Sequence, residues 1–177
     1  MLIYILPIKE VNTEYFDQIS KALEKVFNMS CKILSPMEKP DYAYNPKRNQ
    51  YNASLILNEM NAYASRDANK ILGITDLDLY TRGLNFVFGQ AQLGGGCAIV
   101  STFRLNPKFN KTLKGNSTSI VIERIIKEAI HELGHTFGLD HCSNRRCVMS
   151  FSNDLEQADY KSLEFCQKCL AKLRHLK

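Results

Sequence analysis

The hydrophobic positions of this chain recur at the spacings of both helices and strands. The most regular helical pattern covers residues 116–137, where apolar side chains recur at every third or fourth position. These side chains are Ile122, Ile125, Ile126, Ala129, Ile130, Leu133 and Phe137. The polar run Asn116–Ser119 precedes all of them and supplies an N-cap. The pattern therefore predicts one long helix that buries a continuous face.

Other stretches predict a mixture of strands and shorter helices. Apolar alternation and β-rich composition indicate strands over 2–8, 31–35, the start of 70–80, 84–96 and 97–105. Helical spacing indicates helices over 12–27, 50–64 and 156–176, the first of them capped by Asn12 or Thr13. Residues 36–49 contain three prolines and predict a loop. The order predicts an α/β fold in which helices back a twisted mixed sheet.

Length and composition are those of a globular chain. It has 177 residues, 45% hydrophobic and 23% charged, so we expect one domain of two lobes. No apolar run approaches the ~20 residues of a membrane helix, and we expect no membrane partner. Residues 1–10 lack a basic leader and a small-residue cleavage site, so a first strand in a cytoplasmic protein is expected. The net charge of +5 includes a basic tail that suits a solvated helix better than a nucleic-acid surface, and we expect a monomer.

Three of the four histidines lie within residues 131–141, in the sequence HELGHTFGLDH. On a helix, His131 and His135 differ by about 40° in direction and about 6 Å in rise, so both can reach one ion. On a continued helix His141 would point about 240° away from His135 and could not reach that ion. Gly138 is placed to end the helix in the left-handed conformation. The spacing therefore predicts that the chain turns back and brings His141 to the other two.

This arrangement predicts the chemistry of a zinc metallopeptidase. Three neutral imidazoles on tetrahedral zinc leave one position for water, whose pKa zinc lowers from about 15.7 to about 7. Glu132 lies about 100° round the helix from His131, where it can take the proton from that water and pass it to a leaving amine. One alternative is a helix end with surface histidines. Another is a structural zinc, for which Asp140 is the nearest fourth ligand, although it is expected to face away.

Four of the six cysteines form two close pairs near the end of the chain. They are Cys142, Cys147, Cys166 and Cys169. The second pair has the spacing C-x-x-C and shares one face of the predicted last helix. Two such pairs predict a four-thiolate structural zinc site, which contributes an apparent ~10–16 kcal/mol to folding. Free buried thiols, or disulfides in an oxidising compartment, are the alternatives, and Cys31 and Cys97 are expected to be ordinary buried thiols.

These two clusters divide the chain into two expected sub-domains and predict two zinc ions per chain. Residues 1–138 would hold the sheet and the active-site helix. Residues 139–177 would hold the third histidine and the four cysteines.

The combined motif resembles that of a known peptidase family. HELGHTFGLDH is similar to the metzincin zinc-binding consensus, and its continuation C-x4-C-x-M, then C-x-x-C, is similar to the extended motif of the archaemetzincins. The resemblance is specific over 131–169 and looser at RNQYNAS, GLNFVFGQAQLGG and STFRL. It implies a compact metzincin-like α+β fold with a zinc cleft between an N-terminal part and a small C-terminal part. It also implies that Met149 is the Met-turn residue under the catalytic zinc, where plain core packing is the alternative.

One position departs from the pattern of some metzincins. These enzymes carry a tyrosine two residues after the methionine, where it helps to hold the transition-state oxyanion, and this chain has Phe151. Loss of one such donor typically costs ~100–1000-fold in rate. Tyr51, Tyr63 and Arg104 are candidates to replace it, or the zinc carries the charge alone.

The resemblance also implies a binding mode for peptide substrates. Metzincin-like enzymes bind peptide as an added strand at a sheet edge, and Phe86–Leu93 is the candidate edge here. An internal strand is an equal alternative. Two other functions stay open from the sequence: a zinc-dependent module that binds nucleic acid or protein, and a catalytically silent relative that holds zinc and binds peptides. Few aromatic residues accompany the basic tail, which disfavours base stacking.

Overall fold

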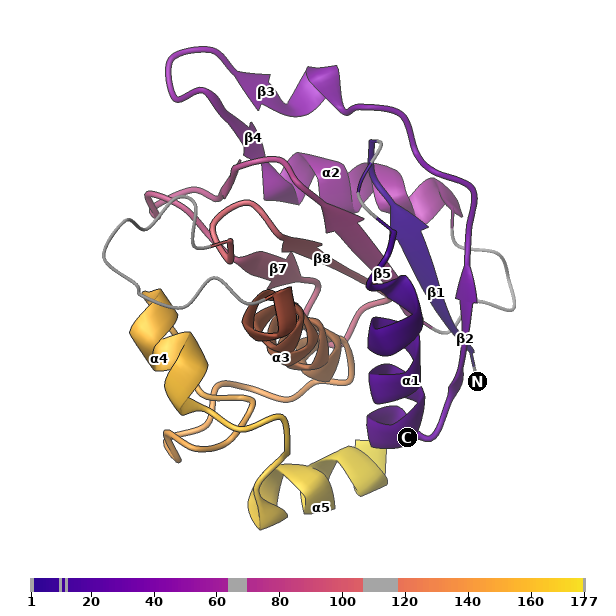
Figure 1. Ribbon diagram of the computed structural model, residues 1–177, viewed down its shortest axis with the longest axis vertical. Coiled ribbons are helices and arrows are strands. Elements are labelled where there is room, and N and C mark those ends of the chain that lie inside the picture. Colours follow the sequence, from indigo (N-terminus) through magenta and orange to yellow (C-terminus); the bar gives the residue numbers. More distant parts are fainter. Residues whose placement is uncertain (1, 10, 12, 64–69, 107–117, 177) are drawn as a thin grey trace.

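A five-stranded sheet forms the centre of the molecule, as seen in the computed structural model (Figure 1). The structure describes residues 2–9, 11, 13–63, 70–106 and 118–176. In spatial order the strands are β2 (Ser30–Ile33), β1 (Leu2–Pro7), β5 (Lys70–Thr75), β8 (Cys97–Ser101) and β7 (Gly89–Ala91). The first four are parallel, and β7 runs antiparallel to β8. The predicted mixed sheet is confirmed, and β7 lies at its edge.

A second, smaller sheet lies beside the first. It consists of β3 (Tyr44–Asn45), β4 (Gln50–Asn52) and β6 (Leu79–Tyr80), in that order. A short 3-10 helix at Asp41–Ala43 precedes it, so the predicted loop over 36–49 contains two short elements. The Asn52 side chain accepts hydrogen bonds from the amides of Ser54 and Leu55 and thereby caps the next helix.

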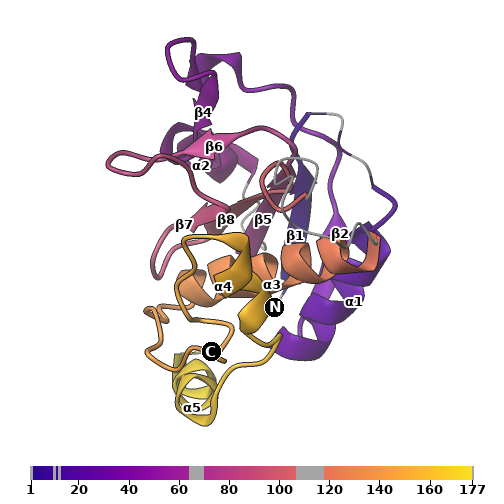
Figure 2. The same cartoon turned by 60° about the vertical axis from the view of Figure 1, so that its left-hand side comes forward.

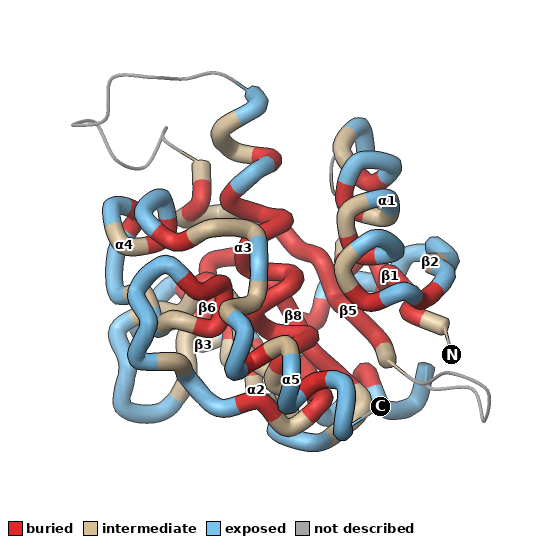
Figure 3. The backbone as a smooth tube through the Cα atoms, turned by 90° about the horizontal axis from the view of Figure 1, so that it is seen from below, coloured by how far each residue is buried: buried red, intermediate tan, exposed pale blue. Residues whose placement is uncertain are grey.

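Helices cover both faces of the large sheet (Figures 1 and 2). The helices α1 (Phe16–Phe27) and α3 (Thr118–Thr136) lie on one face, and α2 (Ala53–Met60) lies on the other. Strand side chains alternate between these two layers, as in β8, where Ala98 and Val100 join the α3 layer while Ile99 joins the α2 layer. Figure 3 shows buried positions running through β5, β8 and most of α3. The sheet is therefore packed on both sides, which explains its continuous apolar strands.

The long helix is confirmed over Thr118–Thr136, and it buries charged residues as well as its apolar face. Arg124 donates to both carboxylate oxygens of Asp159 at 2.6 Å, and the Lys127 ammonium donates to the Asp159 carbonyl at 3.0 Å. Asp159 belongs to α4 (Leu155–Tyr160). These bonds fix α4 against the long helix. The predicted cap residues Asn116 and Ser117 lie outside the described residues.

Three helix predictions differ from the structure. The expected helix over 50–64 begins at Ala53, because Gln50–Asn52 pair in the small sheet; after Met60 a 3-10 turn spans Asn61–Tyr63, and residue 64 is not described. The expected single helix over 156–176 is two helices, α4 and α5 (Gln167–Leu176), separated by residues 161–166. The first helix begins at Phe16 without a side-chain cap, and Asn12 is not described.

Candidate metal centre

His131 and His135 lie one turn apart at the C-terminal end of α3, with their rings turned toward each other. The Nδ1 atom of His131 is 2.8 Å from the carbonyl oxygen of Val148, and that of His135 is 2.6 Å from the carbonyl of Leu139. A ring nitrogen beside a carbonyl must carry the proton, so Nε2 of each ring presents a lone pair. Backbone carbonyls thus leave Nε2 of both rings available to a metal ion.

The helix ends at Thr136, and Gly138 follows as the reversing residue that the sequence predicts. This residue has a φ of 88°, in the left-handed region that glycine tolerates. The Gly138 amide donates to the His135 carbonyl at 2.9 Å, and the Leu139 amide donates to the Gly134 carbonyl at 3.1 Å. This pair of bonds is the Schellman arrangement, which satisfies helix carbonyls while the chain reverses.

The reversal carries His141 back to the other two histidines. Its ring centroid lies 5.3 Å from that of His131 and 4.8 Å from that of His135. One nitrogen from each of the three rings lies within 4.8 Å of the others. His131 is buried, His135 is half-buried and His141 is exposed, so the cluster opens toward solvent on the His141 side.

The geometry of these rings fits a metal ion. The Nε2 atoms of His131 and His135 are only 3.1 Å apart, although both are expected to be acceptors. Two facing lone pairs at that distance repel unless a cation lies between them, and two nitrogens bound to one zinc at about 2.0–2.1 Å would be separated by a similar distance. Burial lowers the pKa of all three histidines, most strongly that of His131, and so favours the neutral form that binds metal.

Glu132 is buried between the long helix and the edge strand. A Cβ atom placed on Gly89 of β7 would lie 2.7 Å from Glu132 Cγ and 2.8 Å from its Oε1, so the carboxylate side chain packs directly on that glycine. Burial raises the pKa of Glu132 well above its ordinary value, and the charge of nearby Glu128 adds to this effect, while Lys161 opposes it. A raised pKa suits a group that must hold a proton in transit.

A cleft of about 620 Å³ lies over these residues, between α3 and the segment that contains β7. Its lining includes Glu128, Glu132, the three histidines and residues 84–91. The predicted edge strand therefore borders the metal cluster, and its position at the sheet edge is confirmed over Gly89–Ala91. Phe151 also lines the cleft, with its ring centroid 4.9 Å from that of His141.

The proposed replacements for a tyrosine hydroxyl lie elsewhere. Tyr51, Tyr63 and Arg104 are absent from the described residues that line the cleft. Tyr51 packs on Tyr44 at a centroid distance of 5.0 Å, and Arg104 pairs with Asp78. None of the three therefore offers a donor beside the histidines.

The sequence did not reveal a buried ion pair beneath the cleft. Lys161 and Glu128 are almost fully buried, and the Lys161 ammonium lies 2.8 Å from Glu128 Oε1, in an ion pair whose alignment falls outside hydrogen-bond geometry. Glu128 lies four residues before Glu132, so helical spacing could have placed it on the cleft side of α3. Lys161 carries no such signal, because only the tertiary fold brings the end of α4 to this point.

Met149 lies under the histidine-bearing part of the helix. A Cβ atom on Gly134, between His131 and His135, would clash with the Met149 sulfur. The Met149 carbonyl accepts a hydrogen bond of 2.9 Å from the Cys142 amide. The methionine side chain thus packs against the helix at Gly134, and its carbonyl holds the segment that follows His141.

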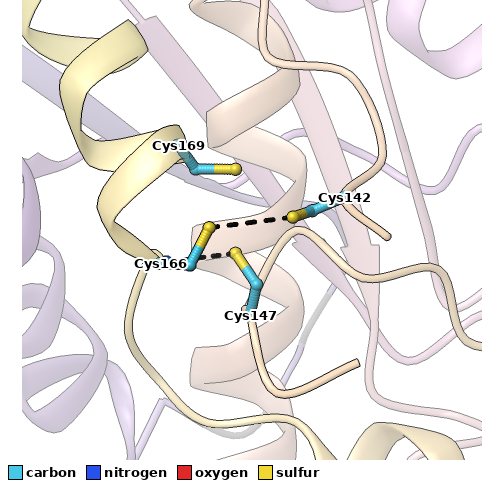
Figure 4. Close-up of side chains that lie close together, drawn as sticks. All are labelled: Cys142, Cys147, Cys166 and Cys169. Atoms are coloured by element: carbon cyan, nitrogen blue, oxygen red, sulfur yellow. Dashed lines mark hydrogen bonds between the residues drawn. The ribbon is translucent and has the colours of Figure 1, made fainter. Parts of the chain in front are cut away.

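The four C-terminal cysteines lie together, and Figure 4 shows their side chains pointing toward one another. Their sulfur atoms lie within 4.8 Å of each other, and those of Cys142 and Cys166 are 3.7 Å apart. That spacing is close to the ~3.8 Å edge of a tetrahedron with zinc–sulfur bonds of about 2.3 Å. All four are free thiols. Cys166 directly precedes α5, and Cys169 lies in its first turn.

The electrostatics of this cluster favour a partly ionised set of sulfurs. A backbone hydrogen bond from Cys169 lowers the pKa of Cys166 to about 7, whereas burial raises the pKa of Cys147 and of Cys169. The Cys166 amide also donates to Cys147 Sγ at 3.2 Å. Zinc binds sets of four converging sulfurs, and the lowered pKa of Cys166 favours the thiolate form that binds the metal.

No described helix has both the length and the apolar composition needed to cross a membrane.

The chain is similar to known proteins over nearly its whole length. Residues 5–175 match Peptidase family M54. The archaemetzincin of Methanocaldococcus jannaschii is 45% identical over 174 residues, which cover 98% of this chain and 93% of that protein. The crystal structure of archaemetzincin from Archaeoglobus fulgidus has a TM-score of 0.83 and 39% identity, covering 97% and 99% of the two chains. That from Methanopyrus kandleri has a TM-score of 0.84 and 34% identity, covering 99% and 94%. The chain therefore belongs to peptidase family M54, the archaemetzincins, and is a zinc metallopeptidase.

Proposed function

We propose that the chain hydrolyses peptide bonds in the cleft between β7 and α3, with Glu132 as the general base. His131, His135 and His141 would hold the catalytic zinc. When bound, zinc supplies Lewis acidity, which polarises the scissile carbonyl and acidifies a water molecule. The observation that carries this proposal is the convergence of three imidazole nitrogens beside a buried carboxylate at the floor of one cleft.

Glu132 would move the proton of the reaction. Its carboxylate takes a proton from the attacking water and gives it to the amine that leaves. Its burial and the neighbouring charge of Glu128 support this role, because both raise its pKa and so favour the protonated form that hands the proton on. Gly89 supports it sterically, since the absence of a side chain there leaves room for the carboxylate.

The peptide would lie along β7 as an added strand. The Phe88 carbonyl and the Gln92 amide form hydrogen bonds with β8. Backbone groups alternate in direction along an antiparallel strand, so the amide and carbonyl groups of Gly89 and Ala91 face away from β8. These amides and carbonyls are placed to pair with an extended peptide. Because Phe151 supplies no hydroxyl beside His141, we expect rates ~100–1000-fold below those of a comparable enzyme with that donor.

The four cysteines would hold a second zinc ion with a structural role. Cys142 immediately follows the third histidine, so the four-thiolate site would fix the segment that carries His141 to α5. We propose residues 139–177 as a sub-domain that depends on this ion, joined to the sub-domain of residues 1–138. Six free thiols suit a reducing cytoplasm, and we propose a monomer there.

The test is the variant Glu132→Gln in zinc-loaded protein. We expect turnover of a fluorogenic peptide library to fall by at least about 100-fold while zinc content stays unchanged, because the amide cannot accept the proton. The double variant His131→Ala/His135→Ala should lose both turnover and one zinc ion. If Glu132→Gln cleaves as fast as the wild type, Glu132 is not the base. If the wild type binds peptide and cleaves none, the chain is a silent peptide-binding relative.

A further inference from the structure

One wall of the cleft is an irregular segment whose backbone is held by side chains. This wall segment, Leu84–Phe88, joins β6 to β7, and all five of its residues line the cleft. A segment outside a regular strand must find other partners for its carbonyl groups. Its last two residues have backbone partners, because the Val87 amide donates to the Leu79 carbonyl at 3.0 Å and the Phe88 carbonyl accepts from the Ser101 amide at 2.8 Å. Side chains supply the partners of the residues before them.

The carbonyls of the wall segment receive donors from the small sheet. The Arg48 Nη2 atom donates to the Leu84 carbonyl at 3.1 Å and to the Asn85 carbonyl at 2.8 Å. The Gln50 amide donates to the same Asn85 carbonyl at 3.0 Å. Arg48 and Gln50 are themselves joined, at 2.9 Å from Arg48 Nε to Gln50 Oε1. Side chains from β4 and the turn before it thus bond the first two carbonyls of the wall segment.

Arg104 holds the same segment through an aromatic ring. Its guanidinium carbon lies 4.4 Å from the centroid of the Phe86 ring, within the range of a cation–π contact. Asp78 fixes the guanidinium by two bonds, 2.6 Å and 2.7 Å long, and only 10% of the Asp78 side chain is exposed. The Gln50 amide lies 3.2 Å from Asp78 Oδ2, which connects this pair to the first set of bonds.

These four residues form one connected unit that touches the wall segment at three consecutive positions. They are Arg48, Gln50, Asp78 and Arg104, and we call them the brace. None of them is among the described residues that line the cleft, so they act on a substrate only through the wall segment. Phe86 packs edge-on against Phe88 at a centroid distance of 5.3 Å, which extends the constraint to the start of β7.

We propose that the brace positions the Leu84–Phe88 wall against an apolar side chain of the bound peptide, and that Arg104 is its central positioning residue. This inference rests on the proposed peptidase function of the cleft. The wall presents Leu84, Phe86 and Val87 to the cleft, and its described lining contains no Lys or Arg side chain. The substrate class that fits is a peptide with a large apolar residue beside the scissile bond.

The experiment compares two zinc-binding probes on the zinc-loaded protein. Acetohydroxamate has almost no side chain and reports on the metal centre alone. A hydroxamate of the dipeptide Phe-Phe reports on the metal centre and the wall together. For Arg104→Ala, calorimetric titration should show that Phe-Phe hydroxamate binds at least about ten-fold more weakly than to the wild type. The affinity for acetohydroxamate should change by less than about two-fold. For cleaved peptides, KM should rise with kcat nearly unchanged.

Three further variants sharpen the test. Arg104→Lys keeps the charge but not the two-pronged bond to Asp78 or the planar contact with Phe86, so it should not restore binding. Arg48 is exposed, and Arg48→Ala should weaken the binding of Phe-Phe hydroxamate by a smaller factor. This variant replaces Arg104→Ala in the test if Arg104→Ala does not fold. Lys39→Ala is the control, because it removes a cation that is paired with Asp41 and lies over the Tyr51 ring, with no residue of the wall segment involved.

Each outcome decides the question. The proposal is overturned if folded Arg104→Ala and Arg48→Ala bind both probes like the wild type, or lose both probes equally. It is also overturned if Arg104→Lys restores full binding, or if the wild type binds Phe-Phe hydroxamate no better than acetohydroxamate. A wild type that discriminates between the probes but cleaves no peptide contradicts the proposed function, and the positioning role of the brace is then retained.

Discussion

Gly89 of the edge strand packs directly on the side chain of Glu132, with space for no additional carbon between them. A Cβ atom on Gly89 would lie 2.7 Å from Glu132 Cγ and also 2.7 Å from the Ile99 carbonyl oxygen. Neither neighbour can retreat freely, because Ile99 belongs to the central strand β8 and Glu132 is buried. The strand proposed to hold the peptide and the residue proposed as the base are therefore in contact.

This contact predicts a loss of activity without loss of metal. In Gly89→Ala the new methyl group should displace the Glu132 carboxylate, and a shift of about 1 Å at a catalytic group can cost about 100-fold in rate. We expect kcat to fall by about that factor while the zinc content stays at the wild-type level. Gly96→Ala is the matched control, because a Cβ there meets no atom within 4 Å. Equal losses in both variants would contradict the prediction.

The two cysteine pairs and the three histidines should respond differently to metal removal. We expect two zinc ions per chain by mass spectrometry of the metal content, and a mild chelator should take the histidine-bound ion first, because that cluster opens to the cleft. Cys166→Ser should lower the thermal midpoint strongly. A structural zinc contributes an apparent ~10–16 kcal/mol to folding, which is as large as the whole net stability of a typical domain, ~5–15 kcal/mol. His131→Ala should empty the cleft with far less loss of stability. A chain that holds one zinc ion, or a Cys166→Ser variant as stable as the wild type, would contradict this.

The ion pair of Lys161 and Glu128 predicts a large loss of stability when one partner is removed. Lys161→Met leaves the Glu128 carboxylate buried without a counter-charge, which typically costs about 3–5 kcal/mol. The double variant Lys161→Met/Glu128→Leu should recover much of that loss, because no charge is then left buried. Urea unfolding of the metal-loaded protein measures both. Lys21→Ala, which breaks an exposed ion pair with Asp17, should leave the midpoint unchanged.

The perturbed pKa values predict how the stability of the metal-free protein changes with pH. The folded state resists protonation of His131, whereas the unfolded chain takes up that proton near pH 6.5, so this histidine removes stability as the pH falls below 6.5. Glu132 has the opposite effect, because its raised pKa lets the folded state bind a proton that the unfolded chain binds only near pH 4.5. The two groups therefore act against each other between pH 6.5 and 4.5.

Removing Glu132 should expose the histidine effect. Metal-free Glu132→Gln is expected to lose about 1 kcal/mol or more of unfolding free energy between pH 7 and pH 5.5, and the wild type is expected to lose less. Urea titrations at a series of pH values measure both slopes. A steeper loss in the wild type than in the variant would show that the Glu132 carboxyl is not held protonated in the fold.

Local pattern was enough to predict the long helix, its end and the position of the metal cluster. The apolar stripe from Ile122 to Phe137 specifies one buried helix face, because helical periodicity is a property of sequence spacing alone. Gly138 then specifies the reversal, since a left-handed residue is needed there and glycine adopts it without strain. The separation of His135 from His141 makes sense only with such a reversal.

Short elements were predicted less well, because their stability comes from partners that are distant in sequence. Gln50–Asn52 has the spacing of a helix start, but Tyr51 and Asn52 pair with Leu79 and Tyr80 in the small sheet. The predicted last helix is interrupted at Lys161, whose ammonium group is drawn into the core by Glu128. A helical pattern does not reveal a competing charge pair.

The sequence by itself determined which residues are the candidates for the chemistry, because metal-ligand spacing on a helix and around a glycine turn is local geometry. Only the tertiary structure decided what surrounds them: the edge position of β7, the contact of Gly89 with Glu132, the ion pair under the cleft and the brace behind its wall. The contacts of Gly89 with Glu132 and of Glu128 with Lys161 join residues 43 and 33 positions apart in the chain. Within the brace, Asp78 and Arg104 are 26 positions apart. Their positions follow from close packing of whole layers, and no local pattern of hydrophobic and polar residues encodes them.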